Sequence, residues 1–304
     1  MNQIIRITFG LTISCLIAAV VMGSVFAVTD KAKKRNEHLK VQEAMLKLLG
    51  YDKAHPKPAD LTLHTFYRYN LEEGEDKYVG YLIPVAKDEK ESYELLVIDL
   101  EGKFVDRVPL DLSPDTAAED AERESALKEA VSPPRTFTFA DSTIVAKQGG
   151  ERVAYVLPGQ FPGFKTFIKV MLALEPDFDI LGLEIMEHEE DPGLGGEIEQ
   201  DYFKNQFKEK PFERLKTLQV VKQPLPDEFK RVLESAKGKE RPMTDMEIRE
   251  IRNKYKEMDI CALTGATISS NAVTLGVKNL VKKFAYRLNT LDAVISAQEV
   301  PAVF

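Results

Sequence analysis

The first long pattern along the chain is an apolar segment without charges, from Ile7 to Val28. Its length matches one helix across the hydrocarbon core of a bilayer, and it exceeds the apolar part of a typical signal peptide. We therefore predict a transmembrane anchor within residues 1–29. Because Val25-Phe26-Ala27 resembles a cleavage site, a signal peptide that is removed stays open as an alternative.

Beyond the anchor, the pattern changes first to a helical period and then to a strand period. Apolar residues at helical spacing between 36 and 49 predict a helical stalk within residues 30–59. Short alternating runs separated by turn residues then predict strands. The first series of predicted strands is Leu61–Tyr69, Tyr78–Ala86, Glu94–Leu100 and Phe104–Leu110, followed by a short acidic helix within 113–134.

A similar order of strands returns later in the chain, so the region 60–134 is interpreted as an accessory strand-rich region and a candidate degenerate repeat. Residues 135–292 form the main domain in this interpretation, and residues 293–304 form a tail. The fold class predicted is α+β, a twisted and mostly antiparallel sheet with packed helices on one N-terminal transmembrane helix. The second series comprises strands at 135–139, 152–157, 167–174 and 180–187, then helices at 201–207, 227–236 and 244–258, the last with a capping box from Thr244 to Glu247.

Small and hydroxylated residues crowd together in Thr264-Gly265-Ala266-Thr267 and the adjoining Ile268-Ser269-Ser270. Apolar residues at helical spacing follow at once, so this cluster predicts a loop that leads into the start of a helix. A helix start offers unpaired N–H groups and the positive end of the helix dipole, which suit a phosphate. Helix capping explains the same composition and is the commoner role of Ser and Thr at such places.

The order of these residues resembles the signature Ser or Thr, Gly, Ala, Thr of FMN-binding subunits in redox-driven ion pumps. The family includes the G subunit of the Rnf complex and the C subunit of the sodium-pumping NADH:quinone oxidoreductase. The resemblance implies that residues 135–292 are an FMN-binding domain whose FMN is covalent, joined through its phosphate to Thr267 as a phosphoester. It also implies the residues that surround the phosphate, which are Thr264, Gly265, Ala266 and Ser269, with Lys222 as a further candidate contact.

One position departs from the pattern of the family. Cys261 stands where the family has an Asp that a flavin transferase recognises, and the nearest acid is Asp259. This departure supports a different class of function, a membrane-anchored scaffold that keeps the fold without the cofactor.

A second pattern lies about seventy residues before the first, in the run from Glu187 to Glu197. It is similar to the loop His-x-Glu-Thr-Pro-Gly-Leu-Gly of the same family, with Asp191 in place of Thr. The resemblance implies that Glu190 and Leu194 lie near the flavin ring. Metal binding at His188 and the adjacent acids is disfavoured, because four neighbouring side chains cannot all point at one ion. A plain acidic turn is the simpler alternative.

Net charge and cysteine content exclude several classes of partner and cofactor. Residues 1–29 contribute only the +1 of Arg6 to the net charge of −8, which leaves −9 for the rest and argues against nucleic acid. Two cysteines are too few for an iron–sulfur cluster or c-type haem. The basic residues after the anchor, from Lys31 to Arg35, favour a cytoplasmic domain by the positive-inside rule. The resemblance implies the opposite side, the periplasmic side of a bacterial inner membrane, and we follow the resemblance.

Taken together, these patterns predict a membrane-anchored electron carrier with covalent FMN on Thr267. The resemblance makes it a redox component of an Rnf-type complex that couples ferredoxin and NAD to ion movement, rather than a stand-alone enzyme. Its partners would be other membrane subunits and, during maturation, a flavin transferase. No catalytic acid–base residue and no metal ligand is predicted. The alternatives are the C subunit of the sodium-pumping quinone reductase, the scaffold without cofactor, and an independent extracytoplasmic flavoprotein reductase.

Overall fold

The computed structural model describes residues 2–87, 90–131, 133–234 and 243–304. The chain divides into two compact units, Met1–Lys47 and Leu48–Phe304.

The first unit is almost entirely helix α1, Asn2–Leu48. Its part Gln3–Phe26 is long and apolar enough to cross a membrane by length and composition, features that a signal sequence near an N-terminus shares. The hydroxyls of Thr8 and Thr12 donate to carbonyl oxygens one turn earlier, which satisfies these polar groups inside the helix. The helix ends at Leu48, so the last part of the stalk predicted for 30–59 is not helical.

The second unit is built on one eight-stranded antiparallel sheet with the order β4-β3-β2-β1-β5-β6-β7-β8. Each half is a meander of four consecutive strands, and the first strands of the two halves pair from Leu61↔Gln148 to Glu72↔Thr136. The α+β class is therefore confirmed, and the sheet continues across the predicted boundary at residue 134. The strands are β1 Leu61–Glu73, β2 Asp76–Lys87, β3 Lys90–Asp99, β4 Phe104–Leu110, β5 Thr136–Gln148, β6 Glu151–Pro162, β7 Phe167–Leu174 and β8 Ile180–Glu187.

Helices lie between the two meanders and after the second one. The capping box predicted from Thr244 to Glu247 is confirmed at the start of α7. Gly238 and Pro242, which stand between the helices predicted at 227–236 and 244–258, lie outside the described residues. The remaining elements are α2 Pro114–Ala118, α3 Asp120–Ala130, the 3-10 helix η1 Gly195–Glu199, α4 Asp201–Lys204, α5 Phe212–Thr217, β9 Val220–Val221, α6 Asp227–Leu233, α7 Asp245–Tyr255, β10 Ile260–Cys261 and α8 Thr267–Ala297.

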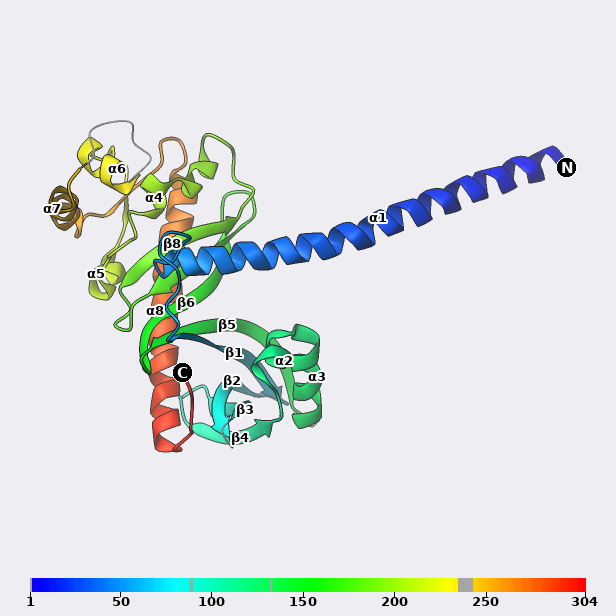
Figure 1. The fold of residues 1–304 in the computed structure, drawn as a ribbon, viewed down its shortest axis with the longest axis horizontal. Coiled ribbons are helices and arrows are strands. Elements are labelled where there is room, and N and C mark those ends of the chain that lie inside the picture. Colours follow the sequence, from blue (N-terminus) through cyan, green and yellow to red (C-terminus); the bar gives the residue numbers. More distant parts are fainter. Residues whose placement is uncertain (1, 88–89, 132, 235–242) are drawn as a thin grey trace. The chain divides into compact units, whose positions relative to one another are not determined.

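Both faces of the first half of the sheet are covered, which explains why β2 is buried at consecutive positions. On one face, Tyr81 and Ile83 belong to the core that includes the apolar side of α8. On the other face, Leu82 belongs to a second core with Ala117 and Leu127 of α2 and α3. Figure 1 shows α8 running along the sheet and α2 and α3 beside the first meander. A strand covered on both faces needs apolar residues at successive positions rather than alternation.

A buried arginine holds α3 against the sheet. Arg123 is 3% exposed, and its guanidinium donates to the hydroxyl of Tyr69 at 2.7 Å and to the carbonyl of Ala117 at 2.7 Å. The same group lies 4.1 Å from the ring centroid of Tyr67. The cation is thus satisfied by polar partners and by an aromatic face, which permits its burial.

The last residues fill a gap between two strands of the sheet. β1 pairs with β2 only from Tyr67 to Glu73, so the second half of β2 has no strand partner on the β1 side. There Ala302 forms a bridge with Val85, and the N–H of Ala86 donates to the carbonyl of Pro301 at 2.9 Å. Residues of the predicted tail are therefore packed as an added strand segment.

Candidate functional site

The loop before α8 is shaped by a short strand and a glycine. β10 pairs in parallel with β9, and the chain then turns at Gly265, which has φ +75°. A Cβ at this residue would also lie 3.0 Å from the side chain of Leu194. Glycine is needed here for both the backbone conformation and the close approach of the other loop.

The start of α8 has no side-chain cap. The N-cap residue is Ala266, and no side chain of the described residues accepts a hydrogen bond from the N–H groups of the first turn. Ser270 supplies the first N–H that bonds within the helix, to the carbonyl of Ala266 at 3.1 Å. By helix geometry the N–H groups of Thr267, Ile268 and Ser269 have no intrahelical acceptor. Capping of the helix by a Ser or Thr side chain, the simpler interpretation of the sequence, is therefore not found at this helix start.

A cavity of about 700 Å³ opens in front of this uncapped helix start. Its size is in the range of cofactor pockets. Three of the predicted site residues line it, Thr264, Gly265 and Thr267, and so does the candidate contact Lys222. The other lining residues are Gly193, Glu197, Tyr202, Gln223, Pro224, Leu225, Asp227, Lys230, Ala262 and Leu263.

One wall of the cavity is an aromatic and charged cluster that the sequence did not reveal. The hydroxyl of Tyr202 donates to Glu197 at 3.0 Å, and Nζ of Lys230 lies 4.6 Å from the Tyr202 ring centroid. Burial and the hydrogen bond to Glu197 raise the pKa of Tyr202 to about 12, so the phenol keeps its proton at neutral pH. These residues come from η1, α4 and α6, which carry no common sequence pattern.

Glu190 lies behind the cavity rather than on its wall. The side chain is 4% exposed, and one carboxylate oxygen accepts the N–H of Phe164 at 2.7 Å and that of Lys165 at 3.2 Å. The other oxygen accepts a short hydrogen bond from the hydroxyl of Ser269. Glu190 and Ser269, both predicted beside the cofactor, therefore bind each other and join the second motif to the first turn of α8.

Two glycines leave room for this carboxylate. A Cβ at Gly163 would lie 2.4 Å from one oxygen of Glu190, and a Cβ at Gly195 would lie 2.8 Å from the other. Neither separation is compatible with a methyl group. The glycine after Leu194 is thus explained by packing on a buried carboxylate, whereas Gly193, with φ +72°, forms the turn.

His188 organises the same loop. Its Nδ1 accepts the N–H of Glu190 at 3.0 Å, and its Nε2 lies 2.9 Å from the carboxylate of Glu199, with poor alignment for a hydrogen bond. The imidazole is directed at its own loop and at η1. Leu194, the other residue predicted near the flavin ring, is 47% exposed and lies against Gly265.

Cys261 is buried away from the cavity. The side-chain amide of Gln206 accepts the N–H of Cys261 at 2.8 Å and donates to its carbonyl at 3.3 Å. Burial raises the pKa of the Cys261 thiol, which disfavours the nucleophilic thiolate. Asp259, the nearest acid in the sequence, is held by the guanidinium of Arg214 at 2.6 Å and by the N–H of Gln219 at 2.9 Å.

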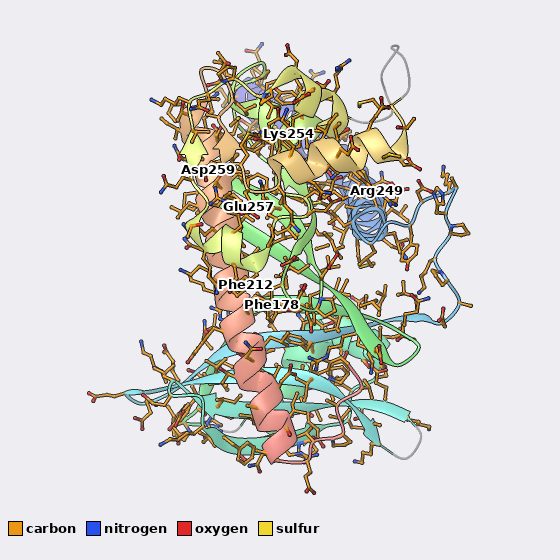
Figure 2. The ribbon with its side chains drawn as sticks, turned by 90° about the vertical axis from the view of Figure 1, so that its left-hand side faces the viewer. Phe178, Phe212, Arg249, Lys254, Glu257 and Asp259 are labelled. Carbon is orange, nitrogen blue, oxygen red and sulfur yellow. The ribbon has the colours of Figure 1, made fainter. Side chains whose placement is uncertain are left out.

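A buried lysine fixes the segment that enters the loop. Nζ of Lys210 donates to the carbonyl of Lys256 at 2.7 Å and to that of Met258 at 2.6 Å, just after the end of α7. Burial, with a smaller effect of Arg214, lowers the pKa of Lys210 to about 8. Figure 2 shows Glu257 and Asp259 in this connection between α7 and β10.

Residues 163–282 match the family of FMN-binding domains, and this stretch includes the loop before α8 and the cavity in front of it. The chain is 32% identical over 138 residues to the G subunit of the proton-translocating ferredoxin:NAD(+) oxidoreductase complex of Clostridium ljungdahlii, covering 45% of this chain and 57% of that protein. It is also 32% identical over 84 residues to the G subunit of the ion-translocating oxidoreductase complex of Haemophilus influenzae, covering 27% of this chain and 41% of that protein. The resemblance stated from the sequence is therefore confirmed. The chain spans little more than half of the first relative's length.

Two solved structures resemble parts of this chain, each with a TM-score below 0.5. NqrC of Shewanella oneidensis has a TM-score of 0.33 and 20% identity over 45% of this chain and 54% of that chain. The C subunit of the Na(+)-translocating NADH-quinone reductase of Parabacteroides distasonis has a TM-score of 0.32 and 17% identity, over 64% of this chain and 74% of that chain.

Proposed function

We propose that this chain is a membrane-anchored electron carrier, with FMN joined by a phosphoester to Thr267, in an Rnf-type complex that couples ferredoxin and NAD to ion movement. The observation that carries the proposal is the uncapped start of α8 facing a cavity of about 700 Å³, with Thr267 on its wall. The names of the relatives support an Rnf-type complex over a sodium-pumping quinone reductase.

The residues at the cavity fit the group. The N–H groups at the start of α8 and the helix dipole stabilise a phosphodiester anion on the Thr267 hydroxyl. Lys222, exposed on the same wall, adds a cation. Pro224, Leu225 and Leu263 supply apolar surface for a ring system. When bound, FMN supplies the capacity to accept and release electrons, and the protein orients it and sets its potential.

The rest of the chain suits an assembly at a membrane. The apolar segment Gln3–Phe26 would anchor the carrier and pack against helices of partner subunits. The FMN domain would face the extracytoplasmic side of a bacterial inner membrane, where a covalent link prevents the loss of a cofactor that cannot readily be replaced. A flavin transferase would attach FMN during maturation, when the Thr267 hydroxyl loses its proton and displaces the leaving group of an activated flavin phosphate.

The test is the intact mass and in-gel flavin fluorescence of the denatured full-length protein from its native membrane. Wild type should carry the mass of FMN, and Thr267→Ala should carry none. Ser296→Ala is the control, because it removes an exposed hydroxyl near the other end of α8 and leaves the loop and the acceptor in place. Retention of covalent flavin in Thr267→Ala would exclude this residue as the acceptor.

A second candidate function is a scaffold without cofactor, favoured by Cys261 in place of Asp. Asp259 does not offer a free carboxylate to a transferase, since Arg214 and the N–H of Gln219 hold it. If wild type and Thr267→Ala both lack flavin while other flavoproteins of the same cells are loaded, the scaffold replaces the carrier.

A further inference from the structure

The N-terminal half of β5 has an open edge. β6 pairs with β5 only where Ile144–Gln148 faces Glu151–Val156, and then continues to Pro162 beside β7. On the side turned away from β1, the segment Thr136–Ala140 has no partner strand within the described residues. In an antiparallel strand, alternate residues direct N–H and C=O groups to that side, where another chain can pair with them.

The sequence of this edge lacks the usual protection. The run Thr-Phe-Thr-Phe-Ala from 136 to 140 has high strand propensity and no charge, whereas natural edges are often protected by charged residues or proline. Phe139 is 44% exposed. A groove of about 550 Å³ follows the edge, and its walls include Phe137 and Phe139 from β5 and Lys128 and Val131 from the α3 side.

The chain fills a comparable gap in the other half of the sheet with its own residues. Where β1 leaves β2, Pro301–Val303 lies beside β2 and makes the bridge from Ala302 to Val85. In this fold, the extended segment Pro301–Val303 thus pairs with a strand where its neighbouring strand has ended. The gap between β5 and β6 has no comparable segment among the described residues.

A cluster of charged side chains at the end of the open edge indicates which charge a pairing segment would carry. Asp141 accepts hydrogen bonds from Arg68 at 3.0 Å and from Arg287 at 3.4 Å, and all three line a small cavity between β5, β6 and α8. Two guanidinium groups share one carboxylate, so the cluster has an excess of one positive charge. Among the described residues, Arg287 on α8 has the 3.4 Å contact to Asp141 as its one hydrogen bond, so its guanidinium keeps N–H donors for a second carboxylate.

We propose that Thr136–Ala140 is a docking edge for an extended segment of a partner protein, which pairs with β5 as an added strand and places one acidic side chain on Arg287. Side chains on one face of the added strand would lie in the groove beside Phe137 and Phe139, and the acidic side chain on the other face would reach Arg287. The inference rests on the open edge and the arginine cluster, and it does not depend on the flavin site.

The test uses the full-length protein in detergent and fluorescein-labelled peptides in which Val and Thr alternate over five residues. One Asp is placed at the first or last position, and matched peptides carry Asn instead. At least one Asp peptide should bind about tenfold more tightly than its Asn counterpart, the size of one charge-assisted hydrogen bond. Methylation of alternate peptide N–H groups should abolish binding, because it removes the donors for strand pairing.

Variants of the chain test the contribution of Arg287 and that of the open edge separately. Arg287→Gln should remove the preference for Asp over Asn, whereas Lys283→Gln, another exposed cation of α8, should retain it. Phe139→Asp should weaken all the peptides at least tenfold. Thermal unfolding of each variant verifies that the fold is kept.

Four outcomes overturn the proposal. Equal affinity of Asp and Asn peptides removes the role of Arg287, and tight binding of the methylated peptides removes strand pairing. Absence of binding at millimolar concentration excludes an open docking edge. If sedimentation shows a dimer that Phe139→Asp dissociates, the occupant is a second copy of the chain instead of a partner.

Discussion

At the scale of single residues, Glu190 connects three segments that are distant in the sequence. Its carboxylate accepts N–H groups from the turn between β6 and β7 and the hydroxyl of Ser269 on α8. A buried carboxylate with these partners fixes the second motif against the helix start. The motif thus shapes the cavity through the positions of its loops, whether or not its side chains touch a flavin.

Glu190→Ala should lower the free energy of unfolding by about 2–3 kcal/mol, because one buried hydroxyl and two part-buried N–H groups lose their acceptor. Urea unfolding of the full-length protein measures the loss. Glu189→Ala, an exposed acid next in the sequence, is the control and should change the stability by less than about 0.5 kcal/mol. Since Glu190 and Ser269 share a hydrogen bond, Glu190→Ala and Ser269→Ala should be non-additive. Full additivity would show that this bond contributes nothing.

The same residues show the limits of sequence reasoning. Thr264, Gly265 and Thr267 lie on the cavity wall, because a local pattern of turn and helix start determines their positions. Glu190 and Ser269 belong to separate motifs, and nothing in either motif reveals that the two side chains meet. Tyr202 and Lys230 come from short helices whose arrangement depends on tertiary packing.

At the scale of elements, the connection between α7 and β10 is fixed by a buried lysine, Lys210. The burial of its charge should have a measurable effect on the free energy of unfolding. Lys210 is 3% exposed and donates to main-chain carbonyls after α7. These hydrogen bonds fix the geometry of the segment that leads to the Thr267 loop. Burial disfavours the charged form, so the folded protein releases this proton more readily than the unfolded chain does.

The pKa of Lys210, lowered from 10.5 to about 8, predicts a specific dependence of stability on pH. Between about pH 8 and 10.5 the unfolded chain binds more protons at this site than the folded protein. The contribution of Lys210 to the free energy of unfolding should therefore rise with pH across this window, by at most about 3 kcal/mol. Urea unfolding of wild type and Lys210→Met at several pH values measures it as a difference.

Lys208→Met is the control, because Lys208 is exposed in the same turn. Its difference from wild type should stay constant with pH. A constant difference for Lys210→Met as well would mean that the carbonyl partners fully offset the burial of the ammonium.

The elements themselves were largely predictable. All eight strands of the sheet were predicted from short alternating or continuous apolar runs bounded by turn residues, because each strand buries one face or both. β5 was predicted to end at Phe139, but it continues to Gln148. Asp141, Ser142 and Thr143 interrupt the apolar pattern, so the pattern predicts an early end of the strand. The strand continues because Arg68 of the neighbouring strand pairs with Asp141, a contact that the positions of apolar residues do not predict.

At the scale of the whole second unit, the sheet joins the two halves that the sequence separates at residue 134. β1 and β5 pair along nearly their full length, and α8 packs across both halves. Phe304 adds to this connection, since its ring lies 5.2 Å from that of Phe66 and its side chain is 5% exposed. The division into an accessory region and an FMN-binding domain stays a prediction.

Phe304→Ala should lower the free energy of unfolding by about 3–4 kcal/mol, through the loss of a buried aromatic ring and the cavity that it leaves. The control is Gln298→Ala, an exposed residue close by in the sequence. Hydrogen exchange followed by mass spectrometry should show that amides of both meanders lose protection together. Loss confined to β1–β4 would indicate that the two halves unfold independently.

The uncapped start of α8 has a consequence for how cells would handle this protein. A helix that begins on Ala266 leaves its first N–H groups without a capping side chain, so an anion bound there would add stability to the folded state. If FMN is attached as proposed, copies without it would be less stable than loaded ones, and proteases that act on unfolded chains would remove them first. Attachment of the cofactor at this turn would then also determine which copies of the protein the cell keeps.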